Sequence, residues 1–291
     1  MSEPGSPGVD RVVRDAAARL ADAGVPSPRA DAELLLAHAA GTGRGEVQRL
    51  ALLGRALPER VLTAYGLLVD ERARRVPLQH LTGTATFAGL ELAVGPGVFV
   101  PRPETELLVD LGAEAAEGLR EPVVVDLCTG SGAVALAVKA RLPLARVHAV
   151  ELSGHAHAWA VANVARTGLE VDLRLGAAES AFEDLLGQAD VVTCNPPYIP
   201  VGAVPVDPEV REHDPEVALY GGSADGLAIP LAVAARAAQL LRPGGVMLME
   251  HAEVQREGIT RALLAAGAWG EVTDHDDLTG RPRVARAVRA G

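Results

Sequence analysis

The chain has 291 residues, of which 48% are hydrophobic and only 3% aromatic, and its formal net charge is −11. This length suffices for one large domain or two smaller ones, and the scarcity of aromatic residues predicts cores built from Ala, Val and Leu. No apolar run is long enough to span a membrane, and the first residues, MSEPGSPGVD, contain no hydrophobic signal segment. The two isolated cysteines exclude a disulfide scaffold. We therefore expect a cytoplasmic protein.

The first 83 residues predict a small helical domain after a disordered start over residues 1–9. Ser27 is a candidate N-cap, because Pro28 occupies the first helical position after it. The helical patterns cover residues 9–23, 28–41, part of 43–54, and 58–75. The charges of this domain have mixed signs, which favours a solvated face over a binding site for its arginines.

Residues 76–83 break the helical pattern, and residues 84–100 predict a β-hairpin linker. Two short strand-like runs, 84–87 and 90–94, flank the turn residues Ala88 and Gly89. The segment that follows leads to Thr105, which marks the start of a helix together with its neighbouring acidic residues. We therefore place the third domain at residues 101–291.

From Pro122 onward strands alternate with helices, which is typical of a parallel sheet. Strands are predicted at residues 123–127, 146–150, 171–175, 190–194, 246–250, 269–274 and 284–288. Helices are predicted at 133–141, 155–167, 227–241 and 254–266. The expected fold class is α/β, with a doubly wound, mostly parallel, seven-stranded sheet.

A glycine-rich turn, Asp126-Leu127-Cys128-Thr129-Gly130-Ser131-Gly132, joins the first of these strands to its helix. Such a turn lets a ligand approach the backbone at a helix N-terminus, although by itself it fits tight packing equally well. Asp126 disfavours a pyrophosphate and suits a cation, and Glu151 ends the next strand, where a carboxylate binds ribose hydroxyls. A cationic, ribose-containing cofactor without phosphates is S-adenosylmethionine.

The segment Asn195-Pro196-Pro197-Tyr198 follows the fourth strand. The two prolines hold the backbone extended. The Asn195 amide oxygen and the Pro196 carbonyl are then two convergent acceptors, which suit a substrate NH₂ group, and Tyr198 is placed to cover it. An ordinary strand-ending turn is the alternative interpretation.

These motifs together resemble class I S-adenosylmethionine-dependent methyltransferases that act on a planar nitrogen. More specific motifs are PLQHLTG at residues 77–83, VFVPRPETEL at 98–107, DGL at 225–227, RPGG at 242–245 and MEH at 249–251. They resemble the peptide chain release factor glutamine N5-methyltransferases over nearly the whole chain. The resemblance implies methylation of the glutamine side-chain nitrogen in the Gly-Gly-Gln motif of release factors, with residues 1–83 as a substrate-recognition domain.

The resemblance and the local chemistry together assign the candidate site residues. Catalytic roles fall to Asn195, Pro196 and Tyr198. Cofactor contacts are assigned to Asp126, Cys128, Thr129, Gly130, Ser131, Gly132, Glu151, Ala178, Glu179 and Asn195. Substrate contacts are assigned to Asn195, Pro196, Pro197, Tyr198, Phe87, Phe99, Arg102 and Glu104. For Phe87 and Phe99 a core or hairpin role is an equal alternative, and for Arg102 and Glu104 the alternative is helix capping.

Two positions depart from the family pattern. Cys128 stands where many relatives have a glycine, and cysteine adopts a positive φ less readily. Relatives usually have an acid near Ala177 for the adenine amino group, whereas the nearest acid in this chain is Glu179. Glu250 and His251 end the fifth strand without a further ligand close in sequence, so we expect a structural or pocket-lining role there and no metal.

Two other functions remain open from the sequence: methylation of a nucleic-acid adenine or guanine base, and a non-catalytic, partner-binding relative. Residues 1–90 contain 11 basic and 10 acidic side chains, which leaves 16 basic and 28 acidic ones in residues 91–291. The acidic larger part argues against a phosphate-binding surface. We expect release factors as partners, no direct contact with nucleic acid or membrane, and a monomer.

Overall fold

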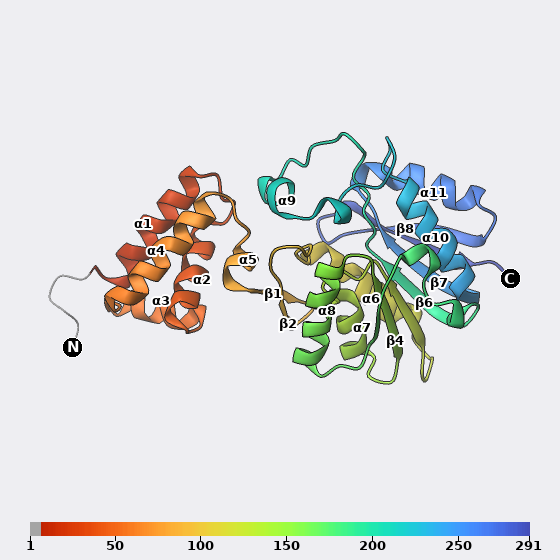
Figure 1. Cartoon of the computed structure of the whole chain (residues 1–291), viewed down its shortest axis with the longest axis horizontal. Helices are drawn as coiled ribbons and strands as arrows, with labels where there is room; N and C mark the ends of the chain where they lie inside the picture. The colour runs from red at the N-terminus through yellow and green to blue at the C-terminus, as the bar shows by residue number, and fades with distance from the viewer. Residues whose placement is uncertain (1–6) are drawn as a thin grey trace. The chain divides into compact units, whose positions relative to one another are not determined.

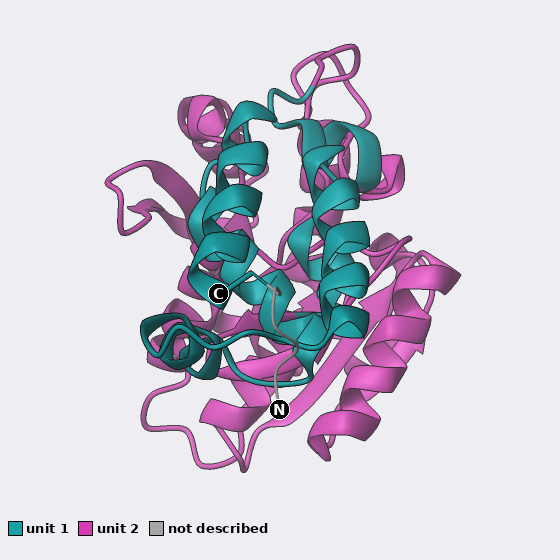
Figure 2. Ribbon diagram, turned by 90° about the vertical axis from the view of Figure 1, so that its left-hand side faces the viewer, with its two compact units in different colours: residues 1–84, 205–213 teal, residues 85–204, 214–291 magenta. Residues whose placement is uncertain are grey.

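The computed structural model describes residues 7–291, whose contacts divide the chain into two compact units. Unit 1 comprises residues 1–84 and 205–213, and unit 2 comprises residues 85–204 and 214–291 (Figure 2). The predicted functional division after residues 83 and 100 stays a prediction. The contacts add that a segment from the middle of the sequence, 205–213, packs with the N-terminal helices.

Unit 1 is a helical bundle around an aliphatic core that includes Leu20, Leu35 and Leu36. Its helices are α1 (Val9–Asp22), α2 (Pro28–Ala40), α3 (Arg44–Leu52), α4 (Glu59–Ala73), α5 (Leu78–Thr82) and α9 (Pro208–His213) (Figure 1). The four predicted helices are confirmed, and α2 ends at Gly41 in the left-handed conformation, which glycine adopts without strain.

Three sequence-based expectations for unit 1 need correction. Gly8 forms a β-bridge with Ala56 and α1 already begins at Val9, so the disordered start does not extend to residues 8 and 9. The rest of that expectation, residues 1–6, lies outside the described residues. Residues 78–82 form α5, and α9 was missed, because helices this short have too little periodicity to detect.

A buried ion network joins α9 to the bundle. Arg72 donates to Asp31 at 2.8 Å and to Glu209 at 2.7 Å, and Arg75 donates to the same Glu209 carboxylate at 2.8 and 2.5 Å. The Arg72, Asp31 and Glu209 side chains are each at most 10% exposed. Each charge is therefore compensated by an opposite charge at hydrogen-bonding distance, which burial requires.

Replacing Arg72 by Met should lower the free energy of unfolding by about 3–5 kcal/mol, because Asp31 and part of Glu209 would stay buried without their cation. Arg74→Met is the matched control, since the Arg74 side chain is 67% exposed, and it should change stability by less than about 0.5 kcal/mol. Urea denaturation of the full chain measures both. Equal effects of the two substitutions would contradict a structural role of the network.

Unit 2 contains a seven-stranded sheet in the order β5-β4-β3-β6-β7-β9-β8. The strands are β3 (Val123–Leu127), β4 (Arg146–Glu151), β5 (Asp172–Leu175), β6 (Ala189–Cys194), β7 (Leu241–Glu250), β8 (Trp269–Asp276) and β9 (Pro282–Arg289). The first five strands in this order are parallel, whereas β9 is antiparallel to β7 and β8. The predicted doubly wound, mostly parallel sheet is confirmed.

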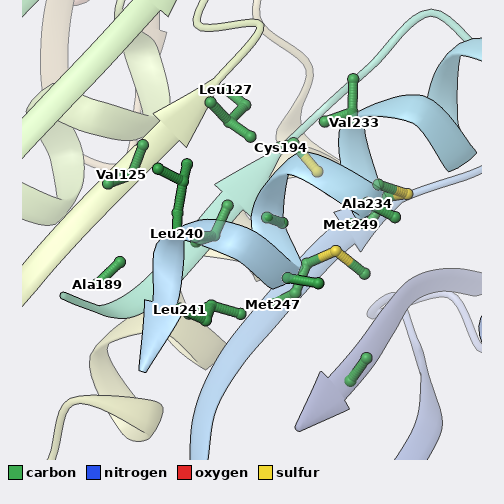
Figure 3. Packing of buried hydrophobic residues seen from close by; sticks show 14 of the residues in the cluster. Val125, Leu127, Ala189, Cys194, Val233, Ala234, Leu240, Leu241, Met247 and Met249 are labelled. Carbon is green, nitrogen blue, oxygen red and sulfur yellow. The ribbon is translucent and has the colours of Figure 1, made fainter. Parts of the chain in front are cut away.

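Helices cover both faces of this sheet. One face packs against α6 (Glu106–Ala115), α7 (Ala133–Arg141) and α8 (Gly154–Thr167), and the other against α10 (Ala228–Leu240) and α11 (Arg256–Ala265) (Figure 1). Consecutive residues of a strand face opposite sides, so Val124 lies in one core and Val125 in the other. Figure 3 shows the second core, where Val125, Leu127 and Cys194 lie near residues of α10 and β7.

Short elements complete unit 2. They are the single-turn helices η1 (Pro103–Thr105), η2 (Ala178–Ser180), η3 (Glu183–Leu185), η4 (Glu216–Ala218) and η5 (Glu253–Gln255). The RPGG motif precedes the strand predicted at residues 246–250, but in the structure it already belongs to β7, next to an irregularity in the pairing of β7 with β6. Arg242, Pro243 and Gly244 are exposed there, and Gly245 is buried. Within residues 7–291 no helix is long and apolar enough to cross a membrane.

The predicted hairpin is present, as β1 (Thr84–Phe87) paired with β2 (Leu90–Ala93). Ala88 and Gly89 at its turn both have positive φ, as a two-residue hairpin loop requires. The next turn lies against α8: a Cβ on Gly95 would come within 2.6 Å of the Trp159 ring, and the indole nitrogen donates to the Pro96 carbonyl at 3.3 Å. This close approach positions the chain that leads to Arg102 and Thr105.

Candidate active site

Two neighbouring parallel strands bring the predicted motifs together. In the pairing of β3 with β6, Leu127 lies opposite Cys194, so the glycine-rich turn and the Asn195 segment leave the same edge of the sheet side by side. On one side of this point the sheet continues to β4 and β5, and on the other to β7. Ligands of doubly wound folds bind at such a reversal of strand order, at the carboxyl ends of the strands.

The backbone of the glycine-rich turn is left-handed at three positions. The φ angles are 61° at Cys128, 59° at Gly130 and 82° at Gly132. At Gly130 the space where a Cβ would stand is open, whereas at Gly132 it is filled by Leu136 and Ala160 at 3.4 and 3.5 Å. Gly130 thus leaves room for a ligand. The expected difficulty at Cys128 is real, because a non-glycine residue adopts this positive φ.

Asp126 lies beneath this turn and is 2% exposed. One carboxylate oxygen accepts from the Thr129 hydroxyl at 2.5 Å and the other from the Thr193 hydroxyl at 2.7 Å. Burial raises the pKa of Asp126 to about 6, although both hydrogen bonds act to lower it. The carboxylate therefore links the turn after β3 to strand β6, and we propose that it serves the cofactor by fixing the turn.

The raised pKa predicts a specific pH dependence of stability. The folded protein holds the Asp126 proton more tightly than the unfolded chain, whose ordinary value is 3.8, so the stabilisation present below about pH 4 is lost as the pH rises through about 6. Asp126→Asn lacks this titration. Its stability relative to the wild type should therefore rise by about 2 kcal/mol between pH 4 and pH 7. Urea denaturation at several pH values measures the difference, and parallel curves would contradict it.

Glu151 ends β4 and faces the turn from the neighbouring strand. Its carboxylate accepts from the Gly130 amide at 2.8 Å and from the Ser153 amide at 2.7 Å. The residue is 9% exposed, and burial raises its pKa. A carboxylate has about four acceptor positions, so capacity remains for the hydroxyls of a ribose.

The turn lies in a concentration of negative charge. Burial raises the pKa of the Cys128 thiol, and the charges of Glu151, Asp126 and Glu179 raise it further. Glu179, in the exposed part of η2, therefore acts on the turn, whereas its neighbour Ala178 is buried. Three carboxylates repel a pyrophosphate and attract a cation, so the residues present fit a sulfonium cofactor without phosphates.

The Asn195 segment has a half-buried amide between buried groups. Pro196 and Pro197 are buried, and the Asn195 Nδ2 atom lies 3.4 Å from the Thr105 hydroxyl oxygen. The Tyr198 hydroxyl donates to Glu250 at 3.1 Å. From the sequence we expected a structural or pocket-lining role for Glu250 and a helix start at Thr105. Their contacts with the Asn195 segment were not predicted, because only the fold brings the start of α6 to the end of β7.

The backbone after Asn195 is held by Gln255 and by the DGL segment, residues 225–227. The Gln255 amide donates to the carbonyls of Tyr198 and Asp225, both at 2.8 Å. Gly226 has a φ of 74°, and a Cβ there would come within 2.1 Å of the Tyr198 carbonyl oxygen. Only glycine fits this position.

Gly226→Ala should therefore lower the free energy of unfolding by more than about 2 kcal/mol, because the methyl group displaces the Tyr198 backbone and the alanine adopts a positive φ. The control is Gly66→Ala in α4, where a Cβ would meet no atom within 4 Å, and there the exchange should be neutral or slightly stabilising. Thermal unfolding of both variants measures the contrast. A stable Gly226→Ala protein would contradict the close approach.

The remaining predicted substrate residues differ in position. Phe87 is 0% exposed in the core between the hairpin and α6, as the alternative interpretation had it, so its ring is not at the surface. Phe99 is half-buried beneath the Arg102 guanidinium, 5.1 Å from the ring centroid, and Arg102 donates to Asp214 at 3.0 Å. Burial raises the pKa of Tyr198, and the negative charges of Glu250 and Glu104 raise it further.

His251 has a structural environment. Its side chain is 0% exposed, with Nε2 2.6 Å from an Asp274 oxygen and Nδ1 2.9 Å from the Ala252 carbonyl. Both ring nitrogens thus have partners within the protein. In the described part of the chain, no three His, Cys, Asp or Glu side chains are grouped to hold a metal ion.

Comparison with known proteins decides the family. Residues 11–83 match the PrmC N-terminal domain model, and residues 91–206 match the methyltransferase small domain model. The release factor glutamine methyltransferase of Streptomyces coelicolor is 49% identical over 282 residues, which are 96% of this chain and 97% of that protein. This chain belongs to the release factor glutamine methyltransferase family.

Other members of the family agree. The release factor glutamine methyltransferase of Mycolicibacterium smegmatis is 48% identical over 95% of this chain and 96% of its own length. That of Deinococcus radiodurans is 42% identical over 96% of this chain and 98% of its own length. The resemblance read from the motifs is thereby confirmed over nearly the full length of the chain.

Solved structures support the fold alone. The hMettl16 catalytic domain, crystallised with the MAT2A 3′UTR hairpin 6, superposes with a TM-score of 0.56 at 15% identity and covers 77% of this chain and 81% of that one. A methyltransferase from Pyrococcus furiosus superposes with a TM-score of 0.50 at 19% identity, over 70% of this chain and 90% of that one. At such identities no substrate is inferred.

Proposed function

We propose that the protein transfers a methyl group from S-adenosylmethionine to the side-chain amide nitrogen of the glutamine in the Gly-Gly-Gln motif of peptide chain release factors. One observation supports this most directly. In a member of the release factor glutamine methyltransferase family, the acceptors of Asn195 and Pro196 emerge beside a turn surrounded by carboxylates. The protein is thus a protein-glutamine N5-methyltransferase.

S-adenosylmethionine, when bound, supplies an electrophilic methyl group on a positively charged sulfur. We assign its amino-acid end to the turn of Thr129–Gly132 and its ribose to Glu151, whose oxygens retain acceptor capacity. Ala178 and Glu179 are assigned to the adenine, with Glu179 in place of the acid that relatives have near Ala177. The negative charge at Cys128 supports this arrangement, because it favours a cation there.

The glutamine amide is a weak nucleophile, since its lone pair is delocalised into the carbonyl. We propose that the Asn195 Oδ1 atom and the Pro196 carbonyl accept its two N–H bonds and orient the nitrogen toward the methyl group. Orientation of this kind provides a large part of a barrier reduction. Positive charge develops on the nitrogen in the transition state, so both hydrogen bonds strengthen there, which is what catalysis requires.

Tyr198 is proposed to pack on the amide plane. Burial raises the pKa of its hydroxyl, which donates to Glu250, so Tyr198 acts through its ring and not as a base. A dedicated strong base is unnecessary, because the N-methylated amide releases its extra proton readily. Phe99, Arg102 and Glu104 are proposed to shape the entry for the glutamine.

Release factors are proposed as the only macromolecular substrates, with the protein acting as a cytoplasmic monomer. The larger part of the chain, residues 91–291, has 28 acidic and 16 basic side chains, which argues against binding of RNA or DNA. Methylation of a nucleic-acid base shares the Asn-Pro-Pro-Tyr chemistry and remains the competing function. The test therefore includes RNA.

The test is methyl transfer from labelled S-adenosylmethionine to a purified release factor, to its Gln→Ala variant at the Gly-Gly-Gln motif, and to total RNA. We expect label on the wild-type factor alone. Label on RNA would replace the proposal by base methylation, and no label together with no cofactor binding would favour a non-catalytic relative.

Asn195→Ala should lower kcat about 10²–10³-fold, the loss typical for removal of one transition-state hydrogen bond, while the Kd of S-adenosylmethionine stays within about threefold. Steady-state kinetics and a cofactor titration measure the two quantities. Near-normal turnover in this variant would contradict the assigned role of the Asn195 oxygen.

A further inference from the structure

An asparagine amide has an oxygen and a nitrogen of nearly the same shape, and only the oxygen accepts a hydrogen bond. If Asn195 turned its NH₂ group toward the substrate, it would oppose the N–H bonds of the glutamine. The active site therefore needs a contact that selects one of two orientations separated by a 180° rotation of the amide.

The structure contains such a contact. The Thr105 hydroxyl donates to the Glu250 Oε2 atom at 2.7 Å, and the same hydroxyl oxygen lies 3.4 Å from Asn195 Nδ2. Thr105 and Glu250 are 4% and 1% exposed, so water does not compete for these groups. Although Thr105 stands at the N-cap of α6, its side chain makes no capping hydrogen bond. The hydroxyl is thus committed to Glu250 and Asn195.

The donors and acceptors fix the direction of both hydrogen bonds that Thr105 makes. A carboxylate only accepts, and a hydroxyl has a single hydrogen. Once Thr105 gives that hydrogen to Glu250, its oxygen has only lone pairs left to offer Asn195. The NH₂ group of Asn195 must then face Thr105, which leaves Oδ1 on the other side.

Both carboxylate oxygens of Glu250 have hydroxyl partners. Burial raises the pKa of Glu250 and the charge of Glu104 adds to the rise, whereas the Thr105 hydroxyl, the charge of Arg283 and the Tyr198 hydroxyl oppose it. Its second oxygen, Oε1, accepts from Tyr198 at 3.1 Å. One buried carboxylate thus fixes both polar side chains of the Asn195–Tyr198 segment.

We propose that Thr105 and Glu250 are positioning residues that select the orientation of the Asn195 amide and present its oxygen to the substrate nitrogen. This inference rests on the proposed function for the identity of the substrate. It extends the site to two residues, 145 positions apart in sequence, whose proposed role is exerted through Asn195.

The decisive variants are Thr105→Val, which keeps the shape and removes the hydroxyl, and Thr105→Ser, which keeps the hydroxyl. Thr105→Val should lower kcat about tenfold, the factor that one ordinary hydrogen bond provides, with the KM for the release factor and the Kd of S-adenosylmethionine within about threefold. Thr105→Ser should stay within about threefold of the wild type. Thr167→Val, which removes a hydroxyl that donates to the Asn163 carbonyl in α8, is the control and should leave kcat unchanged.

A double substitution separates positioning from a structural role. On the Asn195→Ala background there is no amide to orient, so Thr105→Val should add little further loss of kcat. Additive losses, an unchanged kcat in Thr105→Val, or a raised KM as its main effect would each overturn the proposal.

A second measurement is independent of the substrate. In ¹⁵N-labelled protein, the Asn195 side-chain NH₂ should exchange slowly in the wild type and in Thr105→Ser, and faster in Thr105→Val. This result would support the orienting contact even if release factors were not methylated. The measurement therefore distinguishes failure of the proposed function from failure of the proposed contact. Equal exchange in all three proteins would refute the contact itself.

Discussion

A single buried carboxylate, Asp126, joins the two halves of the site. It accepts one hydroxyl from the turn after β3 and one from β6, so the segment proposed for the cofactor and the segment proposed for the substrate share one anchor. Parallel pairing of β3 with β6 makes this link possible, since it places Leu127 opposite Cys194. Because both segments leave the same edge of the sheet, their separation is set by the interstrand distance.

The electrostatics of the site follow from burying such acids. Desolvation disfavours charge at Asp126 and Glu151, as their raised pKa values show, yet hydrogen bonds from hydroxyls and amides offset part of it. The negative charge of these carboxylates is only partly compensated, so the electrostatic potential at the turn is negative and raises the pKa of Cys128. A positively charged cofactor lowers the free energy of these carboxylates, whereas a phosphate raises it. The free-energy cost of burying these carboxylates is thereby linked to selectivity for a cationic cofactor over a phosphate.

Glu250 repeats this arrangement at the end of β7. It accepts from Thr105 and Tyr198 on its two oxygens, as Asp126 accepts from two threonines. In both cases a buried acid, satisfied by hydroxyl donors, fixes side chains that neighbouring segments contribute. Since a carboxylate only accepts, it also dictates which way each hydroxyl points. In unit 1, Glu209 is fixed in a comparable way, but by the cations of Arg72 and Arg75.

The sequence by itself determined the sheet, its helices and the family, because these are encoded in local patterns. The patterns are the strand and helix periodicity, the glycine-rich turn of residues 126–132 and the Asn-Pro-Pro-Tyr segment of residues 195–198. It did not reveal α9 or the contact of Thr105 with Glu250, and it left open whether Phe87 lies in the core. Thr105 has the features of a helix cap, and only the packing of α6 against β6 and β7 brings Glu250 to its hydroxyl. Contacts between residues 145 positions apart depend on how the elements pack, which no local pattern encodes. Tertiary structure alone therefore decided which buried acids orient the site.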